Sequence, residues 1–252
     1  MNRYYEKKKL ILLIGGTGQL GSAIIKSKLL LNIFAPSKKK LNLLNAAQIR
    51  KFCKKNFSII INCAGFPRIR ECEKNKNKSF KLNVATTKNL VREIILQNKK
   101  RQRKIKLVQI SSDAVYNSTR GNYKETNSCN PKTYYGYCKY LSEKLVRKIP
   151  NHLIIRTRFF DKRNFKYKDA ATNIYSSMVE VNKLIKYIKV LINKDVCGVI
   201  NVGERKNSDY NKLKKYIKNI KKTTRDTIQK NTETFITKDS SMNLNKLKKI
   251  LK

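Results

Sequence analysis

The segment Ile11-Leu-Leu-Ile-Gly-Gly-Thr-Gly-Gln-Leu-Gly21 leads from an apolar run through a glycine-rich turn into a helical pattern. The phosphate-binding turn of dinucleotide-binding α/β folds has this context and spacing. In such a turn Gly15 permits a tight bend, Gly18 lets the backbone approach a pyrophosphate, and Gly21 lets the helix pack closely on the sheet. The helix N-terminus then offers free N–H groups to the phosphates. We therefore predict a bound nicotinamide cofactor, and a purely structural glycine turn is the alternative. The predicted contacts in the turn are Gly15, Thr17, Gly18, Gln19, Leu20 and Gly21.

Short apolar runs alternate with longer helical stretches, which is typical of a parallel sheet covered on both faces. Strands are predicted at 10–14, 32–35, 58–63, 105–111, 152–156 and 198–202. Helices are predicted at 19–31, 46–55, 78–97, 134–148 and 181–193, with a last one near 243–251. The pattern predicts an α/β fold: a Rossmann-like, doubly wound parallel sheet with a small C-terminal substrate-binding region. We expect an NAD(P)-binding Rossmann domain over 1–156 and a smaller, partly interleaved substrate-side region over 157–252.

Composition adds an extreme charge to an otherwise ordinary globular chain. The 252 residues are 40% hydrophobic and carry a formal net charge of +43. No run approaches the roughly 18 uninterrupted apolar residues of a membrane span, and the polar start at 1–9 does not resemble a signal peptide. We expect a cytoplasmic protein. Basic residues occur in nearly every segment without a nucleic-acid-binding motif, so we interpret the charge as a general surface property; nucleic-acid binding stays open.

Metal and disulfide chemistry find little support in the sequence. The six cysteines form no Cys-x-x-Cys pair, and His152 is the single histidine. A structural zinc site needs several such ligands at close spacing. We therefore predict no metal site, and we assign no cysteine a redox role.

The second predicted strand indicates which cofactor binds. Dinucleotide-binding folds usually carry an acid about 20 residues beyond the glycines for the adenosine ribose. No Asp or Glu lies between Glu6 and Glu71, and Ser37-Lys38-Lys39-Lys40 follows the strand instead. Cationic side chains suit a 2′-phosphate. This favours NADPH, with Ser37 and Lys38 as contacts, and leaves NADH as the alternative because lysine runs are common in this composition.

A Tyr-x-x-x-Lys pair places both side chains on one helix face, one turn apart. Five of the thirteen tyrosines have a lysine four residues later: Tyr4, Tyr5, Tyr135, Tyr140 and Tyr210. Position favours Tyr135, because it begins a predicted helix soon after a strand that ends near Ser112. We predict that Lys139 lowers the pKa of Tyr135 toward neutrality, and that Ser112 hydrogen-bonds the carbonyl oxygen that Tyr135 protonates.

Three segments carry a family resemblance: Ile110-Ser-Ser-Asp-Ala-Val-Tyr116, Asn130-Pro-Lys-Thr-Tyr-Tyr-Gly-Tyr-Cys-Lys139 and Leu153-Ile-Ile-Arg-Thr157. Together they resemble the extended short-chain dehydrogenase/reductases, and within them the dTDP-4-dehydrorhamnose reductase-like branch of sugar-nucleotide reductases. The likeness spans nearly the whole chain and is most specific in the first 160 residues. Two departures are a serine at 112, where threonine is common, and Arg68-Ile-Arg70 in a segment that often carries aspartate.

The resemblance implies an NAD(P)H-dependent reductase in dTDP-rhamnose or related polysaccharide biosynthesis. Its substrate would be a dTDP- or UDP-linked 4-keto-6-deoxysugar, with hydride added at C4. Tyr135 would donate the proton, Ser112 would orient the ketone, and Lys139 would hold the nicotinamide ribose. The remaining cofactor contacts would be Asn62, Cys63, Ala64, Asn83, Tyr135 and Lys139. The substrate contacts would be Asp113, Arg158 and Phe159, with the basic loop at 162–168 beside them.

Three other functions stay open. The same branch includes a non-catalytic regulatory subunit of methionine adenosyltransferase, and fold does not fix function. A sugar-nucleotide epimerase would use the same Ser112, Tyr135 and Lys139, and a nucleic-acid-associated scaffold would use the charge. Dehydratase chemistry is disfavoured, because Ala114 stands where dehydratases carry a glutamate. The oligomeric state, including a homodimer, also stays open.

Overall fold

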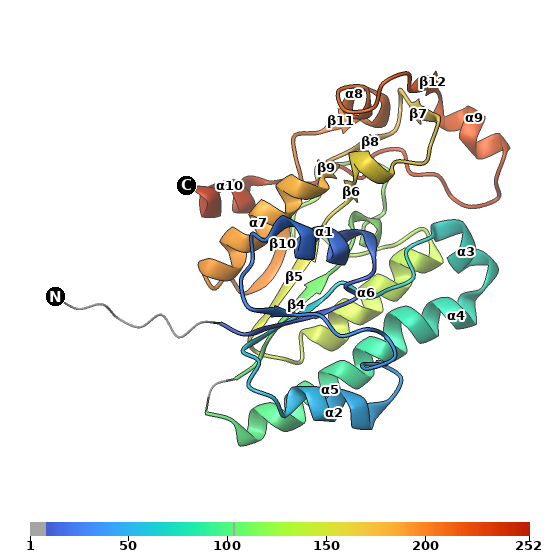
Figure 1. Cartoon of the computed structure of the whole chain (residues 1–252). Coiled ribbons are helices and arrows are strands. Elements are labelled where there is room, and N and C mark those ends of the chain that lie inside the picture. The colour runs from blue at the N-terminus through green and yellow to red at the C-terminus, as the bar shows by residue number, and fades with distance from the viewer. Residues whose placement is uncertain (1–8, 103) are drawn as a thin grey trace.

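The computed structural model describes residues 9–102 and 104–252. Its centre is a six-stranded sheet in the order β10-β5-β4-β3-β1-β2, in which every neighbouring pair is parallel (Figure 1). The strands are β1 Ile11–Ile14, β2 Ile33–Phe34, β3 Ile59–Asn62, β4 Lys106–Ile110, β5 His152–Arg156 and β10 Gly198–Asn201. The predicted Rossmann-like parallel sheet is confirmed.

Helices cover both faces of this sheet because successive strand residues point to opposite sides. Ile11 and Leu13 of β1 join one buried cluster, and Leu12 and Ile14 join another. The first cluster takes in α1, α7 and α10, whose bounds are Gln19–Ser27, Val181–Asn193 and Asn245–Leu251. The second takes in α2, α5 and α6, whose bounds are Ala46–Cys53, Thr86–Lys100 and Tyr134–Val146.

Two predicted helices differ from the structure. The helix expected at 19–31 ends at Ser27, because Lys28 adopts a left-handed conformation (φ 51°) that closes the last turn. The helix expected at 78–97 begins as α4, Lys76–Phe80, and passes through a π-helical turn, η1 Lys81–Ala85, before α5. Such π turns are frequent at functional sites, and this one carries Asn83.

The chain also folds into small elements that the sequence pattern did not predict. They are α3 Ile69–Lys74, η2 Asp113–Val115, β6 Phe159–Phe160, η3 Lys162–Asn164, β7 Asp169–Ala171, β8 Tyr175–Ser176, β9 Val179–Glu180, β11 Asn207–Ser208, α8 Asp209–Leu213, β12 Lys221–Thr223 and α9 Arg225–Lys230. The small strands pair as β6 with β9, β8 with β11, and β7 with β12. Figure 1 shows β7, β8, β11, β12, α8 and α9 together at the opposite end of the molecule from α2.

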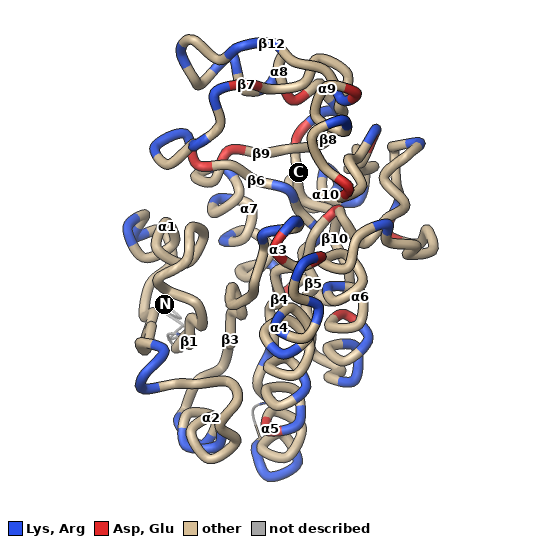
Figure 2. The backbone as a smooth tube through the Cα atoms, turned by 90° about the vertical axis from the view of Figure 1, so that its right-hand side faces the viewer, with Lys and Arg blue, Asp and Glu red and all other residues tan. Residues whose placement is uncertain are grey.

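Lys and Arg residues are spread over the helices that cover the sheet and over the small elements at the end opposite α2 (Figure 2). Within residues 9–102 and 104–252, no helix is long and apolar enough to cross a membrane. The polar start, with Tyr4, Tyr5 and Glu6, and one residue of the basic run at 99–106 lie outside the described residues.

Candidate active site

The glycine turn has the geometry that its sequence predicts. Gly15 has a φ of 83°, and a Cβ placed on it would lie 2.7 Å from the amide nitrogen of Ala64. A Cβ on Gly21 would lie 2.2 Å from the carbonyl oxygen of Gly15. Gly18 begins α1 and no side chain caps its first turn, so these N–H groups face outward beside the exposed Thr17 and Gln19. The Leu20 side chain is buried in the core, so only its backbone faces this turn.

The end of β2 carries the predicted basic segment. Ser37 and Lys38 are both exposed. The carbonyl of Ser37 accepts hydrogen bonds from the amides of Lys40 and Leu41, at 3.0 Å each. The three lysines of this segment, Lys38, Lys39 and Lys40, are exposed.

The loop after β3 is fixed by two buried asparagines. The Asn62 amide donates to Gln109 Oε1 at 2.9 Å, and Asn62 Oδ1 accepts from the Ala64 amide at 3.1 Å. Asn83 Oδ1 accepts from the Phe66 amide at 2.8 Å, and Asn83 Nδ2 donates to the Phe66 carbonyl at 3.2 Å. Asn83 therefore holds the loop backbone from the π turn.

The structure brings Ser112 and Tyr135 together, as predicted. Ser112 follows β4 and is buried, and Tyr135 lies in the first turn of α6. Burial raises the pKa of Tyr135, hydrogen bonding with Ser112 works against that rise, and the Asp113 charge adds to it. The prediction that Lys139 lowers this pKa is wrong for this arrangement, because burial dominates and the ammonium is engaged elsewhere.

Lys139 is buried beneath the strand edge rather than aimed at the phenol. Its Nζ donates to the Ile110 carbonyl at 2.6 Å. Burial lowers the pKa of Lys139 to about 8, and Glu143 and Cys63 oppose this shift. Burial also raises the pKa of Cys63 to about 12, with Lys139 opposing it. Lys139 thus lies between the ends of β3 and β4, where the predicted nicotinamide side is.

Gly136 is a functional position that sequence reasoning missed. A Cβ placed on it would lie 2.2 Å from the carbonyl oxygen of Ala114, in the η2 turn. Thr133 caps α6 by accepting the Gly136 amide at 3.1 Å. The missing side chain lets α6 pack closely against η2, and this brings Tyr135 to Ser112.

The predicted substrate residues separate into two environments. Asp113 is buried, and its carboxylate accepts from Ser112 Oγ at 3.1 Å and from Ser240 Oγ at 2.7 Å. Arg158 is partly exposed and donates to Asp209 Oδ2 at 2.6 Å. Phe159 lies in β6, is partly buried and packs against the core.

Ser240 and Asp209 were not predicted from sequence. Burial raises the pKa of Asp113, while Arg158, Ser240 and Ser112 oppose this and Asp209 adds to it. For Arg158, burial works to lower the pKa, but Asp209 and Asp113 together raise it. Ser240 contacts Asp113, which lies 127 positions away in the sequence, and Asp209 contacts Arg158, which lies 51 positions away. No local motif marks contacts between residues so far apart.

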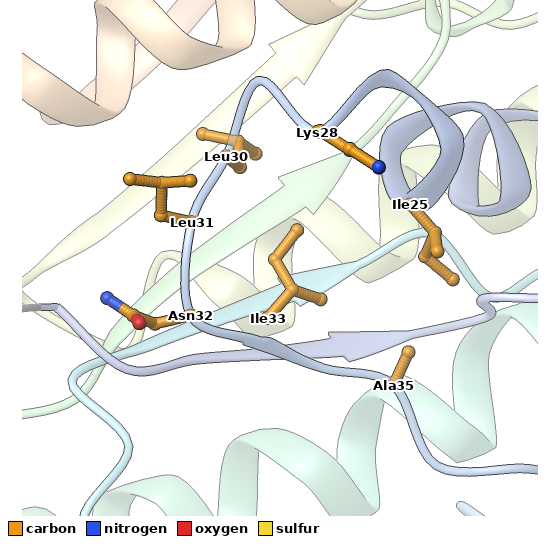
Figure 3. Close-up of a pocket in the computed structure, with 7 residues that line it drawn as sticks. All are labelled: Ile25, Lys28, Leu30, Leu31, Asn32, Ile33 and Ala35. Carbon is orange, nitrogen blue, oxygen red and sulfur yellow. The ribbon is translucent and has the colours of Figure 1, made fainter.

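Two hollows of the surface are lined by residues other than those of this polar cluster. One, of about 340 Å³, lies between the end of α1 and β2, where Ile25, Ile33 and Ala35 point toward one another (Figure 3). A second, of about 480 Å³, is lined by Glu204 and basic side chains that include Lys212. In the part of the chain that the structure describes, no group of three or more His, Cys, Asp or Glu side chains is placed to hold a metal ion.

The chain is similar in sequence to a known protein. A curated relative, the spore coat polysaccharide biosynthesis protein SpsK of Bacillus subtilis (strain 168), is 26% identical over 186 residues, which are 72% of this chain and 62% of the relative. The chain thus spans less than two thirds of that protein's length.

Solved structures are similar over nearly the full length. A dTDP-4-dehydrorhamnose reductase from Bacillus anthracis in complex with NADP superposes with a TM-score of 0.81 at 21% identity, covering 96% of this chain and 92% of that one. A hypothetical dTDP-4-dehydrorhamnose reductase from Sulfolobus tokodaii gives 0.78 at 26% identity, covering 96% and 94%. The model of the RmlD substrate binding domain matches residues 8–194, which is more than half of the chain. The chain belongs to the RmlD substrate binding domain family.

Proposed function

We propose that this chain is an NADPH-dependent oxidoreductase that reduces the C4 ketone of a nucleoside-diphosphate 4-keto-6-deoxysugar. The observation that carries the proposal is the meeting of Ser112, Tyr135 and Lys139 at the strand edge beside the glycine turn. The Bacillus anthracis structure is that of a dTDP-4-dehydrorhamnose reductase with NADP, and the Bacillus subtilis relative is a polysaccharide biosynthesis protein. Both agree with this reaction.

The residues fit a phosphorylated dinucleotide. The tight turn at Gly15 and the uncapped first turn of α1 suit a pyrophosphate. The exposed Ser37 and Lys38 suit a 2′-phosphate. When bound, the cofactor supplies the hydride for the ketone carbon.

The side chains would then handle the proton. Because its pKa is raised, Tyr135 keeps its proton at neutral pH and can donate it to the ketone oxygen. Ser112 would orient that oxygen. Lys139, with a pKa of about 8, is mainly protonated at pH 7 and would bind the nicotinamide ribose beside Asn62 and Asn83.

The substrate would lie against the region formed by 157–252, which we propose as the substrate-side part, with 1–156 as the cofactor domain. The partly exposed Arg158 guanidinium suits the diphosphate. Asp113 and Phe159 complete the proposed contacts. We propose a cytoplasmic enzyme. A homodimer and nucleic-acid binding, for which the sequence carries no motif, both stay open.

Cofactor binding and turnover test the proposal together. The purified protein is titrated with NADPH and NADH by nicotinamide fluorescence, and then given UDP- and dTDP-linked 4-keto-6-deoxysugars while the reduced-cofactor absorbance is followed. We expect oxidation that is lost in Tyr135→Phe and kept in Tyr137→Phe, because Tyr137 is an exposed neighbour on the same helix. Binding without oxidation would indicate the regulatory or epimerase function. No binding would contradict the cofactor site itself.

A further inference from the structure

A late segment of the chain, 237–244, reaches Asp113, the residue after Ser112. Ser240 is 2% exposed, and its hydroxyl donates to Asp113 Oδ2 at 2.7 Å. Its amide donates to the Tyr175 carbonyl at 2.9 Å, and the amide of Asp239 donates to the Ser118 carbonyl at 3.1 Å. The backbone of this segment is therefore held by two other parts of the chain. The segment lies beyond residues 8–194, which the family model matches.

The hydrogen bonds of Ser112 have a defined direction. A hydroxyl has one proton and two acceptor lone pairs. Ser112 Oγ donates that proton to Asp113 Oδ1 at 3.1 Å and accepts the Ala114 amide at 3.1 Å. The hydroxyls of Ser112 and Ser240 therefore both donate to the carboxylate of Asp113, one to each oxygen.

This direction requires an ionised Asp113. Burial opposes ionisation, and a second carboxylate, Asp209 at the start of α8, adds to that opposition. Arg158, which follows β5, and Ser240 favour the carboxylate. Tyr135 on α6 and Cys72 on α3 are the other titratable groups nearby. Arg158 donates its hydrogen bond to Asp209, whereas Ser240 donates directly to Asp113.

We propose that Ser240 is a positioning residue of the active site, which holds Asp113 as the acceptor that fixes the Ser112 hydroxyl beside Tyr135. The inference rests on the proposed reductase function. Asp113 then acts mainly by directing Ser112, and the 237–244 segment completes a catalytic cluster whose other members lie before residue 140.

The pH dependence of turnover tests this role. Removing the Ser240 hydroxyl takes a donor from the carboxylate form, so the pKa of Asp113 rises further. Ser240→Ala should therefore move the acid limb of kcat upward by about one pH unit, with KM little changed. Ser241→Ala is the matched control, because Ser241 is as buried and accepts the Asn122 amide at 3.0 Å rather than contacting Asp113. An unmoved limb, or an equal shift in both variants, would overturn the inference.

A double-mutant cycle separates positioning from general structure. In an Asp113→Asn background, Ser240→Ala should lose most of its effect on kcat, because the acceptor through which it acts is already changed. Additive losses in kcat would contradict the inference. Thermal unfolding of each variant shows whether the fold is kept.

A readout without turnover keeps the two proposals apart. Aspartate labelled with ¹³C at Cγ reports each carboxyl titration by NMR, and Asp113→Asn identifies the Asp113 signal by its loss. We expect this titration to move upward in Ser240→Ala and to stay in Ser241→Ala. An unmoved Asp113 titration overturns the inference whatever the activity is. A moved titration in a chain that oxidises no NADPH keeps the hydrogen-bond chain and overturns the reductase.

Discussion

Two buried carboxylates beside the same sheet edge are held in opposite ways. Glu143 accepts from Ser111 Oγ at 2.6 Å and from Arg156 Nη2 at 2.7 Å, with Arg156 Nε at 3.0 Å. The carboxylate of Asp113 accepts hydrogen bonds from two hydroxyls, those of Ser112 and Ser240. Its neighbouring guanidinium donates instead to Asp209. Glu143 and Arg156 therefore form a buried ion pair, which we call the closed pair. Asp113, its hydroxyl donors Ser112 and Ser240, and Tyr135 form what we call the open cluster.

The strand ends explain how one edge holds both. Ser111 and Ser112 are adjacent, so their side chains point to opposite sides, and each serine reaches one of the two carboxylates. Arg156 is the last residue of β5 and is 1% exposed, while Arg158 lies two residues beyond and is partly exposed. The difference teaches that two buried carboxylates can have different partners: Glu143 is paired with a cation, and Asp113 with hydroxyls.

Breaking the closed pair should have the largest effect. Glu143→Gln leaves the buried Arg156 charge without its carboxylate, and removing one partner of such a pair costs about 3–5 kcal/mol. We expect urea denaturation to show a loss of this size in the free energy of unfolding. Glu143→Gln combined with Arg156→Met should recover much of it, because the unpaired charge is gone. A single-variant loss below about 1 kcal/mol would show that Glu143 is not a structural carboxylate.

Gly136→Ala should move Tyr135 away from Ser112 in the open cluster. Alanine in a helix normally stabilises by about 1 kcal/mol over glycine, but here the Cβ would meet the Ala114 carbonyl at 2.2 Å. We expect a loss of about 1–3 kcal/mol from overpacking, measured by thermal unfolding. Because α6 must move from η2, kcat should fall on the order of 100-fold. A stabilised variant with normal kcat would contradict the close approach.

Asp113→Asn should stabilise the fold, whereas Glu143→Gln and Gly136→Ala should destabilise it. The pKa of Asp113 is raised by burial, so the protonated form stabilises the fold below the ordinary aspartate pKa, and this contribution is lost as the pH rises through the folded pKa. The neutral amide avoids that loss. At pH 7 we expect the free energy of unfolding to rise on the order of 1 kcal/mol while kcat falls. Melting temperatures across pH 4 to 8 check this: equal pH slopes in both proteins would rule it out.

The sequence predicts the sheet and the local motifs of the site better than its long-range contacts. Gly15, Gly18 and Gly21 lie in one local motif, which their spacing identifies. Tyr135 and Lys139 lie in another, which is identified by its spacing together with its position after the strand that ends near Ser112. The predicted direction of the Tyr135 pKa shift is wrong because burial dominates this shift. The burial of Tyr135 depends on how the whole sheet edge packs.

Long-range partners leave no periodic signal. Ser240 lies in a segment whose neighbours are chosen by backbone bonds to Tyr175 and Ser118, residues in other parts of the chain. The π turn at Lys81–Ala85 also has no sequence signal, because its sequence is compatible with an ordinary helix. Gly136 was visible only as part of a family-like run, and its contact with Ala114 required the fold.

The smallest effect should come from the outer contact of the closed pair. Arg147 Nη2 lies 3.9 Å from Glu143 Oε2, but its side chain is 48% exposed, against 1% for Arg156. An exposed ion pair at this spacing in a helix contributes about 0.3–0.5 kcal/mol, and salt screens it. Arg147→Ala should therefore change the free energy of unfolding by no more than that, and less in high salt. A loss near that of Glu143→Gln would mean that Arg147, rather than Arg156, neutralises Glu143, and the contrast between the two carboxylates would then rest on the wrong arginine.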